Sequence, residues 1–452
     1  MGLKPRKALR LLAFTIPSIK LSFIKYTPLS DQFMQLSQPF TLPCGTVLPN
    51  RICKAAMTEG LADADDNPTK ELNTLYQTWA EGGAGLLLSG NIMVDRRYLE
   101  RSGNMVLEDD KDLASFSALA KAGLTAGNQF WVQLNHPGRQ CNRIVNSQPL
   151  APSAVQLNLA GNFGQPREMT EADITDAITR FATSAELVKR AGFTGVQIHS
   201  AHGYLSSQFL SPLTNQRQDK WGGPLGNRAR FLLETVRAVR SAVGKEFPIS
   251  VKLNSADFQQ GGFELADCQQ VATWLCDEGI DLLEVSGGTY ESLEWMDNDE
   301  KRDTTVNREA FFLQYAESIR AATKTPLMIT GGFRHLATME DALSSKALDV
   351  VGIGRPFCVD PAFPNKLLNG SLNEAPQGEQ GLVLGKGWLG PRSRFKLIRA
   401  INNQGQVGWF YQQIINIAQN RPLLVSKSVF SSFIRLTLRE LNLNKRRTLK
   451  VK

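Results

Sequence analysis

The chain alternates short apolar runs with longer segments in which apolar residues recur at spacings of three and four. Eight runs rich in Val, Ile and Leu lie at residues 51–57, 85–91, 129–135, 195–202, 248–254, 282–288, 326–332 and 350–356. Between them, Ile174–Arg190 and Arg228–Val243 have the helical spacing, and Thr170 with the acids after it is a typical helix start. The pattern predicts eight strands that alternate with helices.

Eight strands alternating with helices are the number found in a (β/α)8 TIM barrel, an α/β fold whose buried parallel strands are nearly continuous apolar runs. The alternative is an open, doubly wound sheet. That fold places G-x-G-x-x-G after its first strand, and "AAMTEGLAD" at residues 55–63 does not supply it. We therefore predict the barrel.

The two ends of the chain lie outside this pattern. We expect a basic N-terminal extension at residues 1–33, the barrel at residues 34–372, and a linker, helices and basic tail at residues 373–452. The C-terminal helices are predicted at 407–418 and 429–441, followed by a frayed tail. The first 33 residues fit an upstream start or a targeting peptide, although Pro17 interrupts their apolar run and Met34 opens a segment typical of a protein start.

Charge and cysteine content narrow the possible functions. The net charge of +8 comes from the ends, which carry +6 in the first thirty residues and +13 from Lys386 onward, against −11 between them. This distribution does not predict a nucleic-acid-binding core. Six scattered cysteines without C-x-x-C predict reduced thiols in a cytoplasmic protein, with no zinc or iron–sulfur site. No apolar run is long enough to span a bilayer.

Polar side chains gather where the predicted strands end, which is where barrel enzymes build their sites. His199, His202 and Tyr204 follow the fourth run, in a chain that has four histidines. Three hypotheses fit them. They are core residues, or ligands of a metal-dependent barrel hydrolase together with His136, or paired donors to a carbonyl oxygen with Tyr204 as the proton donor. Spacing alone leaves all three open.

The last two runs end in glycines that are candidates for a phosphate site. Gly331 and Gly332 end the seventh run, and Gly354 and Arg355 end the eighth. In this fold the loops after strands seven and eight commonly hold a phosphate, which backbone N–H groups approach and a guanidinium neutralises. The glycines fit equally well in turns that need a positive φ.

The segment "HSAHGYLSSQFLSPLTNQRQDKWGGPLGNRARF" at residues 199–231 resembles the signature of the Old Yellow Enzyme family of FMN-dependent ene-reductases, also called NADH:flavin oxidoreductases. "NRICKAAMT", "WVQLNHPGR", "ISVKLNSADF" and "VVGIGRPF" are similar to its first, third, fifth and eighth strands, so the resemblance covers roughly residues 37–370. It implies FMN as cofactor and NADH or NADPH as reductant. The implied reaction is ping-pong hydride transfer through flavin N5 to the C=C bond of an enone or enal.

The resemblance also assigns roles to residues. The cofactor-binding group, around the flavin and its phosphate, would be Ala56, Met57, Thr58, Gly90, Gln133, Lys252, Gly331, Gly332, Gly354 and Arg355. Lys252 would stabilise the anionic reduced flavin near N1 and O2. His199 and His202 would bind the substrate carbonyl, and Tyr204 would protonate the α-carbon. No residue is expected to bind a metal.

Some features depart from the family or stay open. "WGGPLGNR" at residues 221–228 replaces Tyr-Gly-Gly-Ser-x-Glu-Asn-Arg, which predicts a local change in the loop without loss of flavin. Cys358 stands alone after the eighth run, so the cysteine cluster of larger relatives is not expected. A flavin-binding scaffold without turnover, which docks to a membrane or a partner through its basic ends, is a further alternative. The physiological alkene, the choice between NADH and NADPH, and a homodimer are not fixed by the sequence.

Overall fold

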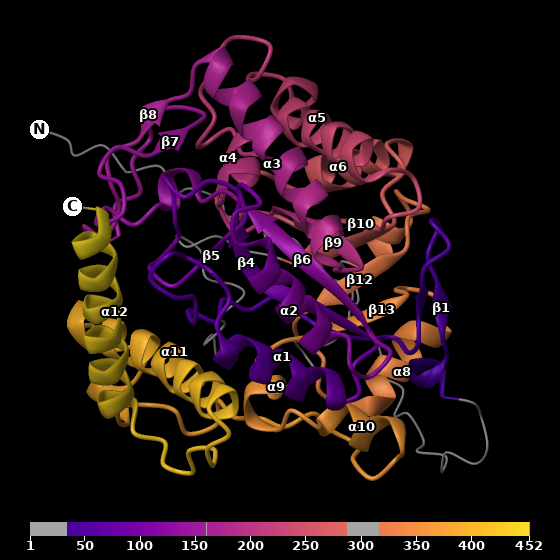
Figure 1. Cartoon of the computed structure of the whole chain (residues 1–452), viewed down its shortest axis with the longest axis vertical. Helices are drawn as coiled ribbons and strands as arrows, with labels where there is room; N and C mark the ends of the chain where they lie inside the picture. The colour runs from indigo at the N-terminus through magenta and orange to yellow at the C-terminus, as the bar shows by residue number, and fades with distance from the viewer. Residues whose placement is uncertain (1–33, 160, 287–315, 452) are drawn as a thin grey trace, which may run out of the picture. The chain divides into compact units, whose positions relative to one another are not determined.

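The eight predicted strands close into a parallel barrel (Figure 1). The computed structural model describes residues 34–159, 161–286 and 316–451, so the predicted extension at residues 1–33 lies outside the described residues. In chain order the barrel strands are β3 (Ile52–Lys54), β4 (Leu86–Met93), β6 (Gln129–Asn135), β9 (Gly195–Ser200), β10 (Ile249–Asn254), β11 (Leu282–Ser286), β12 (Leu327–Thr330) and β13 (Val350–Ile353). Because β13 pairs with β3 and β3 pairs with β4, the barrel is closed and the TIM-barrel prediction is confirmed.

The register of the strands sets which side chains share a level of the barrel. Lys252 on β10 lies opposite His199 on β9 and opposite Glu284 on β11. On the neighbouring strands, Gln133 lies opposite Gln197. Residues that are far apart in the sequence therefore reach the same layer of the barrel interior.

Short strands and helices surround the barrel. Strand β5 (Met105–Val106) extends the sheet beside β4, while β1 (Phe40–Thr41) pairs with β2 (Val47–Leu48) and β7 (Leu150–Ala151) with β8 (Arg167–Glu168). Among the described residues, the α-helices before the C-terminal segment are α1 (Lys70–Glu81), α2 (Leu113–Gly123), α3 (Glu171–Ala191), α4 (Leu205–Leu210), α5 (Leu225–Val243), α6 (Leu265–Asp277), α8 (Leu336–Ser344), α9 (Pro356–Val359) and α10 (Phe363–Leu368).

The predicted helix start at Thr170 is confirmed by a capping box. The Thr170 hydroxyl accepts from the Asp173 N–H (3.2 Å), and the Asp173 carboxylate accepts from the Thr170 N–H (2.8 Å). These bonds satisfy N–H groups that have no partner within the helix. Helix α3 therefore begins at Glu171, three residues before the predicted range.

The C-terminal helices α11 (Lys396–Ala418) and α12 (Val429–Val451) pack on each other, and α11 also packs on α1 and α9 (Figure 1). Gly405 and Gly408 permit the close approach, since a Cβ at these positions would lie 2.4 and 2.5 Å from backbone oxygens of α12. The segment after residue 441, which was predicted to be a frayed tail, is helical and continues α12 to Val451. Barrel and C-terminal helices belong to one compact unit that begins at Met34.

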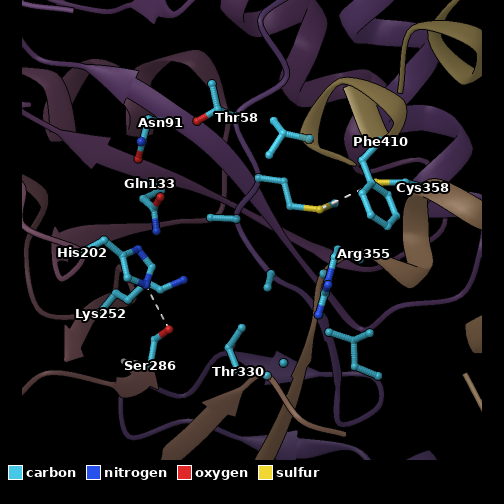
Figure 2. Close-up of a pocket in the computed structure, with 18 of the residues that line it drawn as sticks. Thr58, Asn91, Gln133, His202, Lys252, Ser286, Thr330, Arg355, Cys358 and Phe410 are labelled. Carbon is cyan, nitrogen blue, oxygen red and sulfur yellow. Dashed lines mark hydrogen bonds between the residues drawn. The ribbon is translucent and has the colours of Figure 1, made fainter. Parts of the chain in front are cut away.

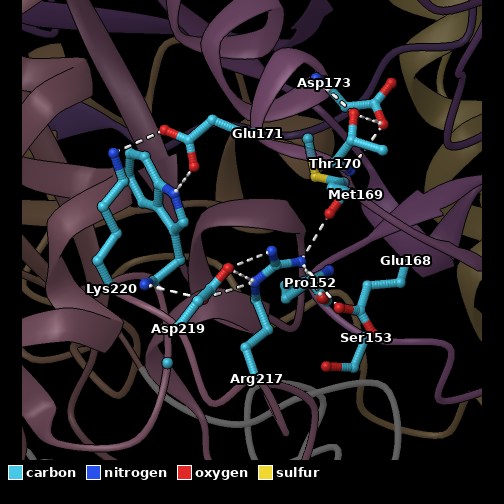
Figure 3. A network of polar contacts seen from close by, with 12 residues as sticks. Pro152, Ser153, Glu168, Met169, Thr170, Glu171, Asp173, Arg217, Asp219 and Lys220 are labelled. Carbon is cyan, nitrogen blue, oxygen red and sulfur yellow. Dashed lines mark hydrogen bonds and ion pairs between the residues drawn. The ribbon is translucent and has the colours of Figure 1, made fainter.

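The loop after α4 is held by the buried guanidinium of Arg217 (Figure 3). Arg217 donates to the Met169 carbonyl oxygen (2.6 Å) and pairs with Asp219 (2.5 Å). Trp221, the first residue of the segment that departs from the family signature, donates its indole N–H to Glu171 at the start of α3 (2.6 Å). The loop is therefore tied to the barrel's outer layer in spite of the changed sequence.

His136, at the end of β6, is buried and makes the folded state sensitive to acid. Its Nδ1 accepts from the Gly138 N–H (3.1 Å), and burial lowers its pKa from 6.5 to about 4. Between these pH values the unfolded chain binds a proton that the folded chain does not. This contribution to stability is complete above pH 6.5, falls as the pH decreases, and is lost by pH 4, at a cost of about 3 kcal/mol.

The corresponding experiment is urea unfolding between pH 7 and pH 4. His136→Asn keeps an acceptor for Gly138 but cannot take up the proton, so its free energy of unfolding is expected to fall less steeply with acid than that of the parent protein. His335→Gln, at a half-exposed position, is the control and is expected to follow the parent. An unchanged slope in His136→Asn would assign the acid sensitivity to other groups.

Within the described ranges, no helix is both long and apolar enough to cross a membrane.

Candidate active site

A cavity of about 340 Å3 lies at the carboxyl ends of the barrel strands (Figure 2). All residues predicted for the site except Gly90 line it, namely Ala56, Met57, Thr58, Gln133, His199, His202, Tyr204, Lys252, Gly331, Gly332, Gly354 and Arg355. The structure therefore brings together residues from six segments of the sequence.

Gly90 is the residue that the structure does not place in the cavity wall. Its N–H donates to the buried Glu59 carboxylate (2.9 Å), and a Cβ at this position would lie 2.3 Å from Glu59 Oε2. The glycine therefore lets β4 approach Glu59 closely, which is a packing role. The neighbouring Asn91 lines the cavity instead.

A chain of hydrogen bonds fixes the protonation of the two histidines. Asn91 Nδ2 donates to Glu100 Oε2 (2.6 Å), which leaves Asn91 Oδ1 to accept from His199 Nδ1 (2.8 Å). His199 Nε2 then has a lone pair and accepts from His202 Nδ1 (3.2 Å). His202 Nε2 in turn accepts from Ser286 Oγ (3.0 Å). The two rings are linked to each other in this structure.

Burial lowers the pKa of both His199 and His202 well below the ordinary value for histidine. The neighbouring ring lowers the pKa of His199 further, and the charge of Lys252 acts in the same direction on both. Both rings are therefore neutral near pH 7, and each has one N–H group. Neutral imidazoles can polarise a carbonyl oxygen without adding a positive charge to a buried site.

The turn after β9 directs three of these side chains into the cavity. His202 and Gly203 both have positive φ values, of 58° and 76°, and the His202 N–H donates to Asn254 Oδ1 (3.0 Å). A non-glycine residue in this region is strained and is usually held by its surroundings. Tyr204 follows, 3% exposed, with its ring centroid 4.7 Å from that of His199. The strained backbone at His202 therefore lies in the turn that brings His199, His202 and Tyr204 together.

The hypothesis of a metal site lacks a ligand set among the residues that the structure describes. None of their His, Cys, Asp and Glu side chains form a group of three or more that could hold a metal ion. His136, the third ligand considered, does not line the cavity.

A second polar chain crosses the barrel interior beneath the cavity. Lys252 Nζ pairs with Glu284 Oε1 (2.9 Å), and both side chains are almost fully buried. Glu284 Oε2 accepts from Gln197 Nε2 (2.7 Å), and Gln197 Oε1 accepts from Gln133 Nε2 (2.6 Å). Gln133 therefore keeps its own carbonyl oxygen as an acceptor for a ligand. Lys252 lines the cavity as predicted, but its charge is balanced by a carboxylate.

Removing the carboxylate of Glu284 is expected to be strongly destabilising. Glu284→Gln leaves the Lys252 ammonium buried without its counter-charge, at a cost of about 3 kcal/mol in the free energy of unfolding. The double variant Glu284→Leu with Lys252→Met removes both charges and is expected to recover most of that loss. Urea unfolding of the three proteins measures both values, and equal stability of the single and double variants would contradict the pairing.

The other end of the cavity has features of an anion site. Gly331 and Gly332 have φ values of 111° and 81°, which turns the chain so that backbone N–H groups can approach a ligand. Arg355 lies beside Arg334, which the sequence analysis missed, and Glu379 contacts both, at 3.8 and 2.7 Å. Burial opposes ionisation of Glu379, but the two guanidinium groups lower its pKa to about 2.

One wall of the cavity comes from a segment that carried no predicted site residue. Helix α11 contributes Gln406, Val407, Phe410, Tyr411 and Ile414, which share one face of the helix. Figure 2 shows Phe410, Cys358 and Arg355 on the same side of the cavity. No sequence motif marked this face, because its spacing is that of any amphipathic helix that packs on a core.

The polar groups that line the cavity fit an elongated ligand with a heterocycle at one end and a phosphate at the other. Gln133 offers an acceptor and Lys252 a donor for the heterocycle, while the glycine turn and two arginines suit the phosphate. Thr330 also lines the cavity, and its buried hydroxyl has no hydrogen-bond partner among the described residues. A buried hydroxyl of this kind is suited to bind a ligand.

Comparison with known proteins points to one family. Residues 35–374 match the model of the NADH:flavin oxidoreductase / NADH oxidase family. The chain is 37% identical over 358 residues to the NADH-dependent flavin oxidoreductase iliE of Hypocrea jecorina, which covers 74% of this chain and 89% of that protein. It is also 37% identical over 340 residues to the NADH-dependent flavin oxidoreductase nadA of Aspergillus parasiticus, covering 72% and 76%.

Solved structures agree with these sequence matches. An Old Yellow Enzyme homologue from Zymomonas mobilis is 26% identical, with a TM-score of 0.64 over 76% of this chain and 95% of that one. Morphinone reductase is 25% identical, with a TM-score of 0.62 over 76% and 92%. Residues 375–452, which include α11 and α12, lie beyond the matched family model.

Proposed function

The chain belongs to the NADH:flavin oxidoreductase / NADH oxidase family, the Old Yellow Enzyme family, and we propose that it is an FMN-dependent ene-reductase. Its substrates are α,β-unsaturated carbonyl compounds, and NADH or NADPH is the reductant. The observation that carries this proposal is Tyr204 beside the linked His199 and His202 in the wall of one cavity.

The residues of the cavity fit FMN. Gln133 and Lys252, which both line the cavity, would hold the pyrimidine end of the flavin, and the Gly331–Gly332 turn with Arg355 would hold the phosphate. When bound, FMN supplies the hydride for the alkene. The counter-charge of Glu284 limits how strongly Lys252 attracts negative charge in this part of the site.

The histidine pair would hold the carbonyl oxygen of the substrate. His202 can donate its Nδ1–H to that oxygen once its bond to His199 Nε2 is broken. His199, whose N–H is on Nδ1 and bonds to Asn91, can donate there only after its proton moves to Nε2. The Tyr204 hydroxyl, which keeps its proton at neutral pH, then donates that proton to the α-carbon. Both rings are neutral when they bind the oxygen, because burial and the charge of Lys252 lower the pKa of each.

The test is an anaerobic visible spectrum of the purified protein before and after addition of NADH or NADPH. A flavin spectrum that bleaches with the nucleotide and recovers with cyclohexenone is the expected result. Protein that contains FMN but is not reduced by either nucleotide would contradict the proposal. Protein that cannot be reconstituted with FMN would contradict the cofactor assignment.

The location and partners are proposals of the same kind. Six cysteines without a disulfide fit a cytoplasmic protein. A homodimer is also consistent with the proposal, and sedimentation of the purified flavoprotein would measure it.

A further inference from the structure

The outer face of α12 carries an exposed apolar stripe. Phe430, Ile434, Leu438 and Leu441 are 54, 41, 56 and 56% exposed, and spacings of four, four and three residues place them on one side of the helix. The opposite side, with buried residues such as Leu436, packs on α11. In Figure 1 α12 stands at the margin of the molecule, with α11 on its inner side.

Basic residues accompany the stripe. Lys427, Arg435 and Lys445 are exposed on or next to α12. The last seven residues of the chain add two arginines and two lysines. Glu440 is the one acid from residue 386 to the end of the sequence, and it pairs with Arg101 of the barrel. The C-terminal segment therefore presents apolar side chains within a positively charged setting.

We propose that the outer face of α12 binds the surface of an anionic lipid bilayer. The apolar stripe would enter the boundary between headgroups and acyl chains, and the basic residues would face lipid phosphates. Charge selects this occupant. A second copy of the protein would bring two strongly basic C-terminal segments together, and their like charges would repel each other. Residues 1–30 carry a charge of +6, so the basic C-terminal segment would repel them as well. A nucleic acid would not cover the apolar side chains.

The helix is fixed to the body in a way that keeps this face outward. Arg439 donates to the Gly60 carbonyl oxygen (2.6 Å), and Ser102 bonds to Asn444, in addition to the contact between Arg101 and Glu440. All three contacts join α12 to loops of the barrel. The proposal does not depend on the reaction catalysed.

The test is flotation of the full-length flavoprotein with vesicles. We expect it to float with phosphatidylcholine mixed with phosphatidylglycerol, at low salt more than at high salt, and not with phosphatidylcholine alone. The variant with Ile434→Ser and Leu438→Ser is expected to lower partitioning about tenfold. Arg435→Glu with Lys445→Glu is expected to weaken it and to reduce its dependence on salt. Ile144→Ser, an equally exposed position on the barrel, is the matched control.

Several outcomes would overturn the proposal. One is that the protein does not bind the anionic vesicles. Another is that the double variant Ile434→Ser with Leu438→Ser binds them as well as the parent protein does, while its flavin spectrum and thermal midpoint are unchanged. A dimer in sedimentation that this double variant dissociates would assign the face to a second copy. If the protein floated only after removal of residues 1–33, the occupant of the outer face of α12 in the full-length protein would be that segment.

Discussion

Tyr204→Phe is expected to slow the oxidative half-reaction with an enone by about 100- to 10,000-fold, the usual contribution of a general acid. The reductive half-reaction with NADH is expected to be nearly unchanged, because it needs no proton from this hydroxyl. The phenylalanine ring retains the packing of Tyr204 against His199, whose ring centroid lies 4.7 Å away. The loss therefore isolates the hydroxyl group from the shape of the cavity.

Stopped-flow absorbance, with each half-reaction recorded separately, measures this split. Tyr98→Phe is a matched control, since Tyr98 is also buried near the rim but does not line the cavity. Equal losses in both half-reactions of Tyr204→Phe would reject the proton-donor role. They would indicate instead that the substitution disturbs the whole site.

The barrel could be predicted because parallel strands covered on both sides have a simple sequence pattern. All eight runs became barrel strands, since a strand that is buried on both faces is rich in apolar residues along its whole length. The ends of those runs also located the site, because the fold brings the carboxyl ends of its strands to one edge. His199 could be assigned to the cavity for this reason before any contact was known, whereas Gln133 was assigned by the family resemblance.

Contacts between distant segments could not be predicted in the same way. Glu284 could have been recognised from the sequence, because a lone carboxylate in the apolar strand 282–286 needs a buried partner. That partner is Lys252. Gly90 was assigned to the cavity, but the pairing of β4 with β6 is irregular between Leu88 and Asn91, and Asn91 lines the cavity instead. The wall formed by α11 had no signal at all, because the sequence does not specify where a helix beyond the barrel will dock.

The second large effect is expected at His199. His199→Phe keeps a flat ring beside Tyr204 but removes both nitrogen atoms, so the substrate carbonyl loses one donor and the chain from Asn91 to His202 is interrupted. Loss of one such donor typically costs about 100- to 1,000-fold in rate. The oxidative half-reaction with an enone is the measurement, after the flavin spectrum has shown that the cofactor is retained.

Ser286→Ala provides the comparison, because Ser286 donates to His202 at the outer end of the same chain and has no bond to His199. Loss of the Ser286 hydroxyl removes one neutral hydrogen bond and is expected to lower the rate of the oxidative half-reaction less than tenfold. If His199→Phe kept its rate while Ser286→Ala lost most of it, His202 alone would bind the carbonyl. Ser286 would then fix the working tautomer from the opposite end of the chain, and Asn91 and Glu100 would have only a structural part.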